Sequence, residues 1–193
     1  MSNRIITISR EFGSGGHTVG KKVAERLGIP CYDNELIQKI AEQSGFVEEY
    51  IKEEGEHVPQ SSWLASAFTG WNWNGPSNQD LLWTIQRNII LELAEKESCV
   101  IVGRCADFIL RDKNWLRVFI HASMEKRAVR IVNEYGERRE APEQRLKSKD
   151  KRRASYYRFY TDMKWGQSQN YHIALDSGEL GLDKCADIIC SLY

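Results

Sequence analysis

The fold is decided by residues 5–18, which read IITISREFGSGGHT. Residues 4–8 form a short, β-branched and apolar run, typical of a buried strand that ends at Ser9. Glycines follow at positions 13, 15 and 16. Apolar residues then recur at helical spacing over residues 19–27, until Gly28 ends the helix. The stretch therefore predicts a strand, a glycine-rich turn and a helix in direct succession.

A glycine turn at this place is suited to binding an anion. Backbone N–H groups converge at the N-terminus of the helix, where the helix dipole also favours negative charge. Glycine lets the backbone wrap closely around a phosphate. Thr18, early in the helix, is placed where a hydroxyl could ligand Mg²⁺ held by a nucleotide such as ATP. The residues expected to bind the donor phosphates are Gly13, Ser14, Gly15, Gly16, His17 and Thr18.

The turn departs from the standard phosphate-binding pattern, Gly-x-x-x-x-Gly-Lys-Ser/Thr. With Thr18 as the last member, His17 stands at the lysine position and Glu11 at the first glycine. The missing positive charge could come from Arg10, Lys21 or Lys22. The structural alternative is a glycine-rich connection that links strand to helix and binds nothing.

Strands and helices alternate along the rest of the chain. Further strands are predicted at residues 29–32, 99–103, 116–120 and 171–175. Helices are predicted after Asp33 and at residues 79–96, 123–135, 142–163 and 182–192. This alternation predicts an α/β fold with a five-stranded, mostly parallel sheet covered by helices on both faces. Together with the glycine turn, it is typical of a three-layer P-loop NTPase fold.

Length and composition limit the classes of protein to consider. One domain of 193 residues with an inserted segment fits better than two domains. The formal net charge is zero, so no nucleic acid or membrane partner is expected. The five cysteines are scattered without a Cys-x-x-Cys pair, which favours reduced thiols over a disulfide framework or zinc site. With no apolar run of membrane-spanning length, a cytoplasmic location is expected.

Five segments, in order along the chain, resemble the cytidylate kinase-like group of P-loop nucleoside monophosphate kinases. They are residues 5–16, 100–104, 118–128, 150–153 and 173–180, of which 118–128 reads VFIHASMEKRA. The first segment resembles the divergent branch of that group, which also lacks the usual lysine; an alternative alignment places the lysine position at Gly16. Val102 and Cys105 stand where the family pattern has aspartates beside its arginine. The resemblance is weakest between about residues 45 and 83.

The resemblance implies a single kinase-like domain that uses ATP and Mg²⁺. It implies an acceptor-binding insertion at about residues 45–76 and a lid at about residues 133–147. Arg104 is implied as a phosphate ligand, and Asp150 with Arg153 as the pair that grips the acceptor's sugar and phosphate. Asp33 lies near the implied acceptor site, although it is equally well explained as a helix N-cap. The residues expected to act on the transferring phosphoryl group are Arg10, Arg127, Arg130 and Arg153.

A basic segment supports phosphate binding. Residues 126–153 hold eleven lysines and arginines against five acidic residues. The planar guanidinium group contacts two phosphate oxygens at once, and phosphoryl transfer depends on positioning and neutralising such oxygens. Arg127 and Arg130 are three residues apart and share a helix face, as do Lys147, Asp150, Arg153 and Tyr157. The alternatives are a solvated basic helix or RNA contact, but no stacking array of aromatic residues is interleaved with these charges.

Tryptophan and asparagine are concentrated in residues 63–74, within the implied acceptor-binding insertion. These side chains could stack and read a base, or they could pack against the protein body or a second subunit. A homodimer is therefore compatible with the sequence. His57, His121 and His172 have no partners at the spacing of a metal site or catalytic triad.

The sequence leads to one main functional hypothesis and two alternatives. The main hypothesis is a phosphotransferase that moves the γ-phosphoryl group of ATP to a nucleoside monophosphate such as CMP. The missing lysine and aspartates keep open a nucleotide-binding regulatory module that no longer catalyses. A kinase of another small molecule would differ from the main hypothesis only in its acceptor.

Overall fold

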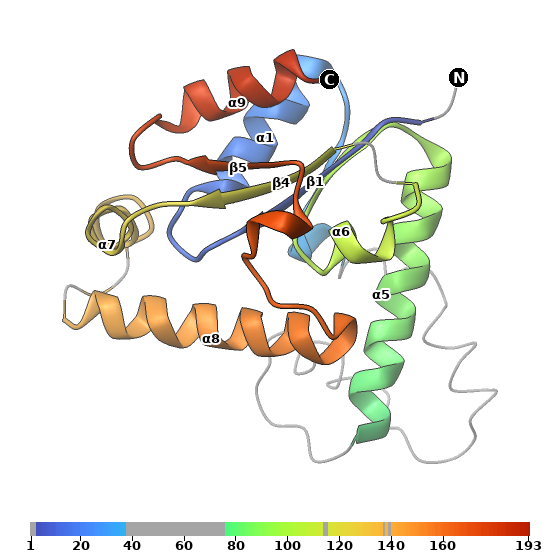
Figure 1. Ribbon diagram of the computed structural model, residues 1–193, viewed down its shortest axis with the longest axis horizontal. Coiled ribbons are helices and arrows are strands. Elements are labelled where there is room, and N and C mark those ends of the chain that lie inside the picture. The colour runs from blue at the N-terminus through green and yellow to red at the C-terminus, as the bar shows by residue number, and fades with distance from the viewer. Residues whose placement is uncertain (1–2, 38–75, 114–115, 137, 139) are drawn as a thin grey trace.

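The computed structural model describes residues 3–37, 76–113, 116–136, 138 and 140–193, and its centre is a five-stranded parallel sheet (Figure 1). The strands are β1 (Ile5–Arg10), β2 (Cys31–Tyr32), β3 (Cys99–Val102), β4 (Leu116–His121) and β5 (Ile173–Asp176). Their order across the sheet is β2-β3-β1-β4-β5. Every pairing is parallel, with Ile8 beside Val102 on one side and Val118 on the other. The predicted α/β fold is confirmed.

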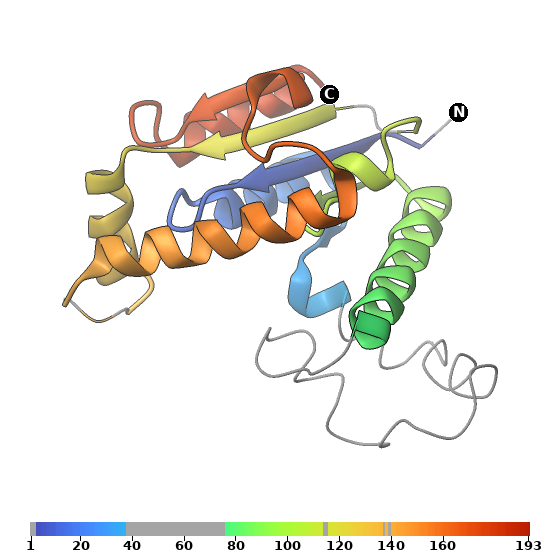
Figure 2. The ribbon, with the colours of Figure 1, turned by 60° about the horizontal axis from the view of Figure 1, so that its bottom comes forward.

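Helices cover both faces of this sheet and complete three layers (Figures 1 and 2). One face carries α1 (Gly16–Leu27) and α9 (Leu182–Ser191). The other face carries α5 (Pro76–Lys96), α6 (Ala106–Ile109) and the long α8 (Pro142–Thr161). The remaining helix, α7 (Met124–Asn133), extends from the end of β4 toward the start of α8. A 3₁₀ turn, Ser168–Asn170, precedes β5.

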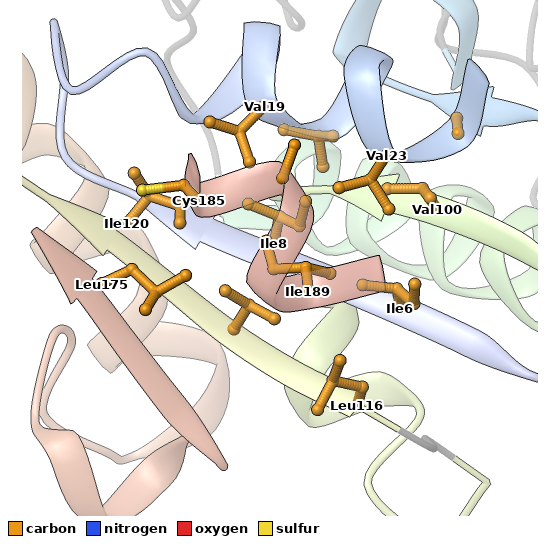
Figure 3. Packing of buried hydrophobic residues seen from close by; sticks show 14 residues of the cluster. Ile6, Ile8, Val19, Val23, Val100, Leu116, Ile120, Leu175, Cys185 and Ile189 are labelled. Atoms are coloured by element: carbon orange, nitrogen blue, oxygen red, sulfur yellow. The ribbon is translucent and has the colours of Figure 1, made fainter. Parts of the chain in front are cut away.

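The central strand is apolar throughout because it is buried on both faces. Side chains alternate across a strand, so Ile6 and Ile8 face α1 and α9, where they pack with Val23 and Ile189 (Figure 3). Ile5 points to the opposite face and joins the core formed with α5 and α6. Burying a side chain of this size stabilises the fold by about 1.5–3 kcal/mol. The two cores fix β1, and β1 fixes where the glycine turn begins.

Several element boundaries differ from those predicted. The helix α5 begins at Pro76 rather than at residue 79, because proline is well suited to the first turn of a helix. The last strand begins at Ile173 rather than at Tyr171. The short helix α6 follows β3 and was not predicted, since four residues carry no readable periodicity. Asp33 does act as a helix cap: its Oδ1 accepts a hydrogen bond from the Leu36 N–H at 3.0 Å.

Two expectations lie partly or wholly outside the described residues. The implied insertion at 45–76 falls outside them except for residue 76, and so do the tryptophans that made a homodimer compatible with the sequence. The implied lid at 133–147 is described except at residues 137 and 139. Within the described part of the chain, no helix combines the length and apolar character needed to cross a membrane.

Candidate functional site

Two cavities share a border at the carboxyl ends of β1 and β3. The turn cavity, of about 370 Å³, surrounds the glycine turn and includes Gly13, Gly15, Gly16, His17 and Thr18 in its lining. The basic cavity, of about 320 Å³, lies among β3, α6 and α8 and includes Arg104 and Tyr156. Arg10, Asn34 and Arg153 line both. In a parallel α/β sheet this edge is the usual place for a ligand.

The backbone of the turn is bent so that α1 begins against the turn cavity. Gly13 and Gly15 have φ values of +78° and +76°, a region that side chains other than glycine rarely adopt. The first N–H groups of α1, at Gly16, His17 and Thr18, have no partner within the helix by virtue of their position. They are therefore available as hydrogen-bond donors to an anion.

Close packing leaves no space for a side chain at Gly15 or Gly16. A Cβ atom on Gly15 would lie 2.5 Å from Leu182 Cδ2, and one on Gly16 would lie 2.5 Å from Arg10 Cβ. The buried Ser14 fixes the bend, because its Oγ donates to Glu11 O at 2.9 Å. Its own carbonyl oxygen accepts from the Ser177 hydroxyl at 2.5 Å. The glycines are thus required for packing as well as for conformation.

Arg10 stands between the two cavities at the end of β1. Its burial lowers its pKa, and the charges of Arg153 and Arg104 lower it further, against the opposing effect of Asp33. Like charges held this close favour a bound anion, because an anion relieves the repulsion. Three arginines from β1, the β3–α6 connection and α8 therefore converge where a phosphoryl group could pass between the cavities.

Arg104 lies in a connection between β3 and α6 that has an unusual backbone conformation. Three consecutive residues have positive φ: Gly103 at +82°, Arg104 at +57° and Cys105 at +53°. For residues other than glycine, this region costs roughly 1–3 kcal/mol each, and such strain often marks functional sites. Cys105 is buried, and burial raises the pKa of its thiol, so it cannot replace the carboxylate that the family pattern has there.

Cationic and aromatic side chains form the wall of the basic cavity. Arg10 and Arg104 are joined there by Lys149, Arg152 and Arg153 of α8. Among the described residues, no carboxylate lines this cavity. Tyr157 and Trp165 supply the aromatic part: the Tyr157 hydroxyl donates to the buried Asp107 at 2.7 Å, and Trp165 Nε1 donates to Ser9 Oγ at 3.2 Å. The cavity is therefore suited to an anionic group attached to a ring or other flat surface.

His17 and Asp33 form a pair at the rim of the turn cavity. Their Nε2 and Oδ2 atoms are 2.7 Å apart. Burial raises the pKa of Asp33, but the Leu36 N–H and His17 more than offset this, so its pKa is lowered overall and it is ionised at neutral pH. Both residues line the turn cavity together with Thr18. The family resemblance implies an acceptor role for Asp33, but Asp33 is not among the described residues that line the basic cavity.

Arg127, Arg130 and Asp150 lie behind the turn, and none of the three is among the described residues that line either cavity. Arg127 Nη1 donates to Phe12 O at 3.1 Å and to Asp150 Oδ2 at 2.6 Å. Arg130 Nη1 donates to Gly13 O at 3.0 Å. Arg153 differs from them, because it donates to Arg10 O at 2.9 Å and also lines both cavities.

Sequence reasoning missed several residues of the two cavities. Lys149, Arg152 and Tyr156 of α8 are among them, although with the predicted Arg153 they follow the i, i+3, i+4, i+7 spacing of one helix face. Tyr135, just after α7, also lines the turn cavity. No local pattern marks Asn34, Tyr135 or Trp165, because they reach the site through tertiary packing alone.

Comparisons with known proteins bear on the family and the fold of the chain. The family model described as the cytidylate kinase-like family matches residues 5–179. A protein named cytidylate kinase from Archaeoglobus fulgidus is 26% identical over 187 residues, which cover 95% of this chain and 91% of that protein.

Solved structures extend the likeness to the whole fold. The crystal structure of an uncharacterized protein from Eubacterium ventriosum has a TM-score of 0.74 and 33% identity, covering 98% of this chain and 97% of that one. A gluconokinase from Sinorhizobium meliloti, at 17% identity, shares the fold with a TM-score of 0.57 over 98% of this chain and 93% of its own. Family and fold together make the chain a nucleotide-binding phosphotransferase of the kinase type. The chain belongs to the cytidylate kinase-like family.

Proposed function

We propose that this protein transfers the γ-phosphoryl group of ATP to a nucleoside monophosphate, with CMP as the first candidate. The observation that carries the proposal is the shared lining of the two cavities by Arg10 and Arg153. A phosphoryl group moving from the turn cavity to the basic cavity stays in reach of both guanidinium groups. Such transfer needs charge neutralisation and alignment more than covalent chemistry from the protein.

The turn cavity fits the triphosphate of ATP. Its donors are the N–H groups at the start of α1, and His17 and Arg10 add side-chain donors. The proposed donor-binding residues on the turn are Gly13 to Thr18, and the Thr18 hydroxyl would hold Mg²⁺. Mg²⁺, when bound, neutralises charge on the phosphate oxygens. Arg10 supplies the positive charge that lysine provides in the standard pattern, since it lies at the same cavity.

The basic cavity fits an acceptor that carries a phosphate. Arg104 and Arg153 are the proposed phosphate ligands, and Asp33 approaches from the rim of the turn cavity. The aromatic wall offers a surface for the nucleoside. In this proposal the chain acts as one domain, with an acceptor-binding insertion at about 45–76 and a lid at about 133–147. The described cysteines are all free thiols, which fits a reducing cytoplasm.

A second candidate is a nucleotide-binding regulatory module without catalysis. The observation in its favour is that His17 and Gly16 occupy the alternative lysine positions, while Val102 and Cys105 replace the family's aspartates. A kinase of another phosphorylated small molecule would use the same two cavities.

The test is an incubation of the purified protein with ATP, Mg²⁺ and a panel of nucleoside monophosphates and other phosphorylated small molecules, followed by separation of the products. The main proposal expects a nucleoside diphosphate from at least one acceptor. ADP binding by calorimetry without any product would select the regulatory module. Transfer to a different phosphorylated compound alone would select the third function.

A further inference from the structure

The carbonyl groups of residues 10 to 13, which lead into the glycine turn, are all engaged by hydrogen bonds within the protein. From residue 10 to residue 13, each carbonyl oxygen accepts a hydrogen bond: Arg10 O from Arg153, Glu11 O from Ser14, Phe12 O from Arg127 and Gly13 O from Arg130. A carbonyl oxygen that faced the turn cavity would repel a phosphate. Three of the four donors are arginines of α7 and α8. These two helices therefore fix the orientation of the peptide groups of residues 10 to 13.

Asp150 is the acidic centre of this arrangement. Its Oδ1 accepts from the Phe12 N–H at 2.7 Å, and its Oδ2 accepts from Arg127 Nη1 at 2.6 Å. Both carboxylate oxygens are therefore engaged, and the side chain is only 16% exposed. Because Arg127 in turn holds Phe12 O, Asp150 controls both the donor and the acceptor of the Phe12 backbone.

Arg127 is fixed by further contacts, so it can link Asp150 to the backbone of Phe12. It is 5% exposed, and its guanidinium also donates from Nε to Ala122 O at 3.0 Å. Glu11 Oε2 lies 3.4 Å from the same Nε and accepts from the Ala122 N–H at 3.2 Å. Removing either carboxylate would leave the buried charge of Arg127 less compensated, which is destabilising.

We propose that Asp150 is a positioning residue for the donor side of the site. It acts through Arg127 and the Phe12 backbone, and it holds the glycine turn in the conformation that binds phosphate. This assigns Asp150 a role different from the acceptor contact that the family resemblance implies. The inference rests on the proposed function for the identity of the donor nucleotide, but not for the shape of the turn.

The test compares Asp150→Asn with Asp162→Asn. The Phe12 N–H and Arg127 bind different oxygens of the carboxylate, and in asparagine an NH₂ group, which cannot accept, replaces one of those oxygens and faces one of the two donors. Asp162 is the exposed C-cap of the same helix, and its replacement removes the same charge without touching the turn. Calorimetry would measure ADP with Mg²⁺ and, separately, CMP, while hydrogen exchange would follow the Phe12 amide in the free protein.

The expected result for Asp150→Asn is an ADP dissociation constant raised about tenfold, with CMP changed less than about twofold and faster exchange at Phe12. Asp162→Asn should leave all three unchanged. Weaker CMP binding with unchanged ADP binding and unchanged exchange would overturn the inference, as would no effect of Asp150→Asn at all.

A second variant and a second measurement cover the cases in which the first comparison fails. If Asp150→Asn does not fold, Asp150→Glu retains the charge but displaces the carboxylate, and it should still weaken ADP binding; unaltered ADP affinity would contradict the inference. If the unaltered protein binds no ADP, the proposed function fails, and exchange at Phe12 then decides the positioning role alone.

Discussion

The guanidinium group of Arg10 occupies the space beside Gly103 that any larger residue at position 103 would fill. A Cβ atom on Gly103 would collide with Arg10 Nη1. The end of β1 and the end of β3 are neighbours in the sheet, so this contact fixes the arginine at the border of the two cavities.

Replacing Gly103 with alanine should displace Arg10 from the site. We expect a loss of kcat of about 10-fold to 100-fold, because a charge-neutralising donor then stands in the wrong place. The control is Gly28→Ala, since Gly28 also has a positive φ, +65°, but nothing lies within 4 Å of a Cβ there. Steady-state kinetics of both variants give the comparison, and equal losses in the two would show that backbone strain alone is responsible.

Asp107 should make stability depend on pH. Burial raises its pKa above the ordinary value, against the opposing hydrogen bond from Tyr157. The unfolded state therefore loses its proton at a lower pH than the folded state, so stability falls as the pH rises from the ordinary aspartate pKa to the raised one, and it stays lower above that. Asp107→Asn removes that destabilisation while an amide oxygen still accepts from Tyr157.

The expected outcome is a larger free energy of unfolding for Asp107→Asn than for the unaltered protein at pH 8, by about 1 kcal/mol. The difference should shrink as the pH falls toward the ordinary aspartate range, because the native carboxyl is then protonated as well. Denaturant titrations at several pH values measure it. A constant difference across the range would refute this account of Asp107.

Tyr135 should contribute its hydroxyl group to nucleotide binding. It lines the turn cavity, where burial raises its pKa while the Arg130 charge and the Gly15 N–H favour the phenolate. Because the Tyr135 oxygen accepts from the Gly15 N–H, its hydroxyl hydrogen can still be donated to a phosphate. Tyr135→Phe should raise the ADP dissociation constant about fivefold, as expected for one lost hydrogen bond. Tighter binding would mean that the hydroxyl competes with the ligand.

Nucleotide should stabilise the protein through the arginines at the shared border. At a concentration one hundred times its dissociation constant, ADP with Mg²⁺ should add about 2.7 kcal/mol and raise Tm by about 5–10 °C. At the same ADP concentration, the shift should be clearly smaller in Arg10→Gln, since the charge that replaces the missing lysine is gone. Differential scanning fluorimetry measures both; an undiminished shift would exclude Arg10 from the donor site.

The sequence predicts the fold well because the decisive signals are local. The apolar run of β1, the glycines and the periodic apolar residues of α1 lie within one continuous stretch, and burial on both faces of the sheet enforces that pattern. The short helix α6 was missed because it has too few residues to show a period.

The site is predictable only where its residues follow from a local motif. Gly15, His17 and Thr18, which the glycine motif singled out, line the turn cavity. The contacts of Arg127 and Arg130 were not foreseeable, because their partners Phe12 and Gly13 are more than one hundred residues away along the chain. A basic helix indicates that phosphate is near, but only the tertiary structure separates arginines that line a cavity from arginines that hold a backbone.

A crystal structure of the protein with ADP and Mg²⁺ tests the central claim most directly. The account predicts that the phosphates lie in the turn cavity, within hydrogen-bonding distance of the N–H groups of Gly16 to Thr18, with Arg10 and Arg153 beside the terminal phosphate. Phosphates bound at any other place, with the glycine turn contacting no part of the nucleotide, would contradict it.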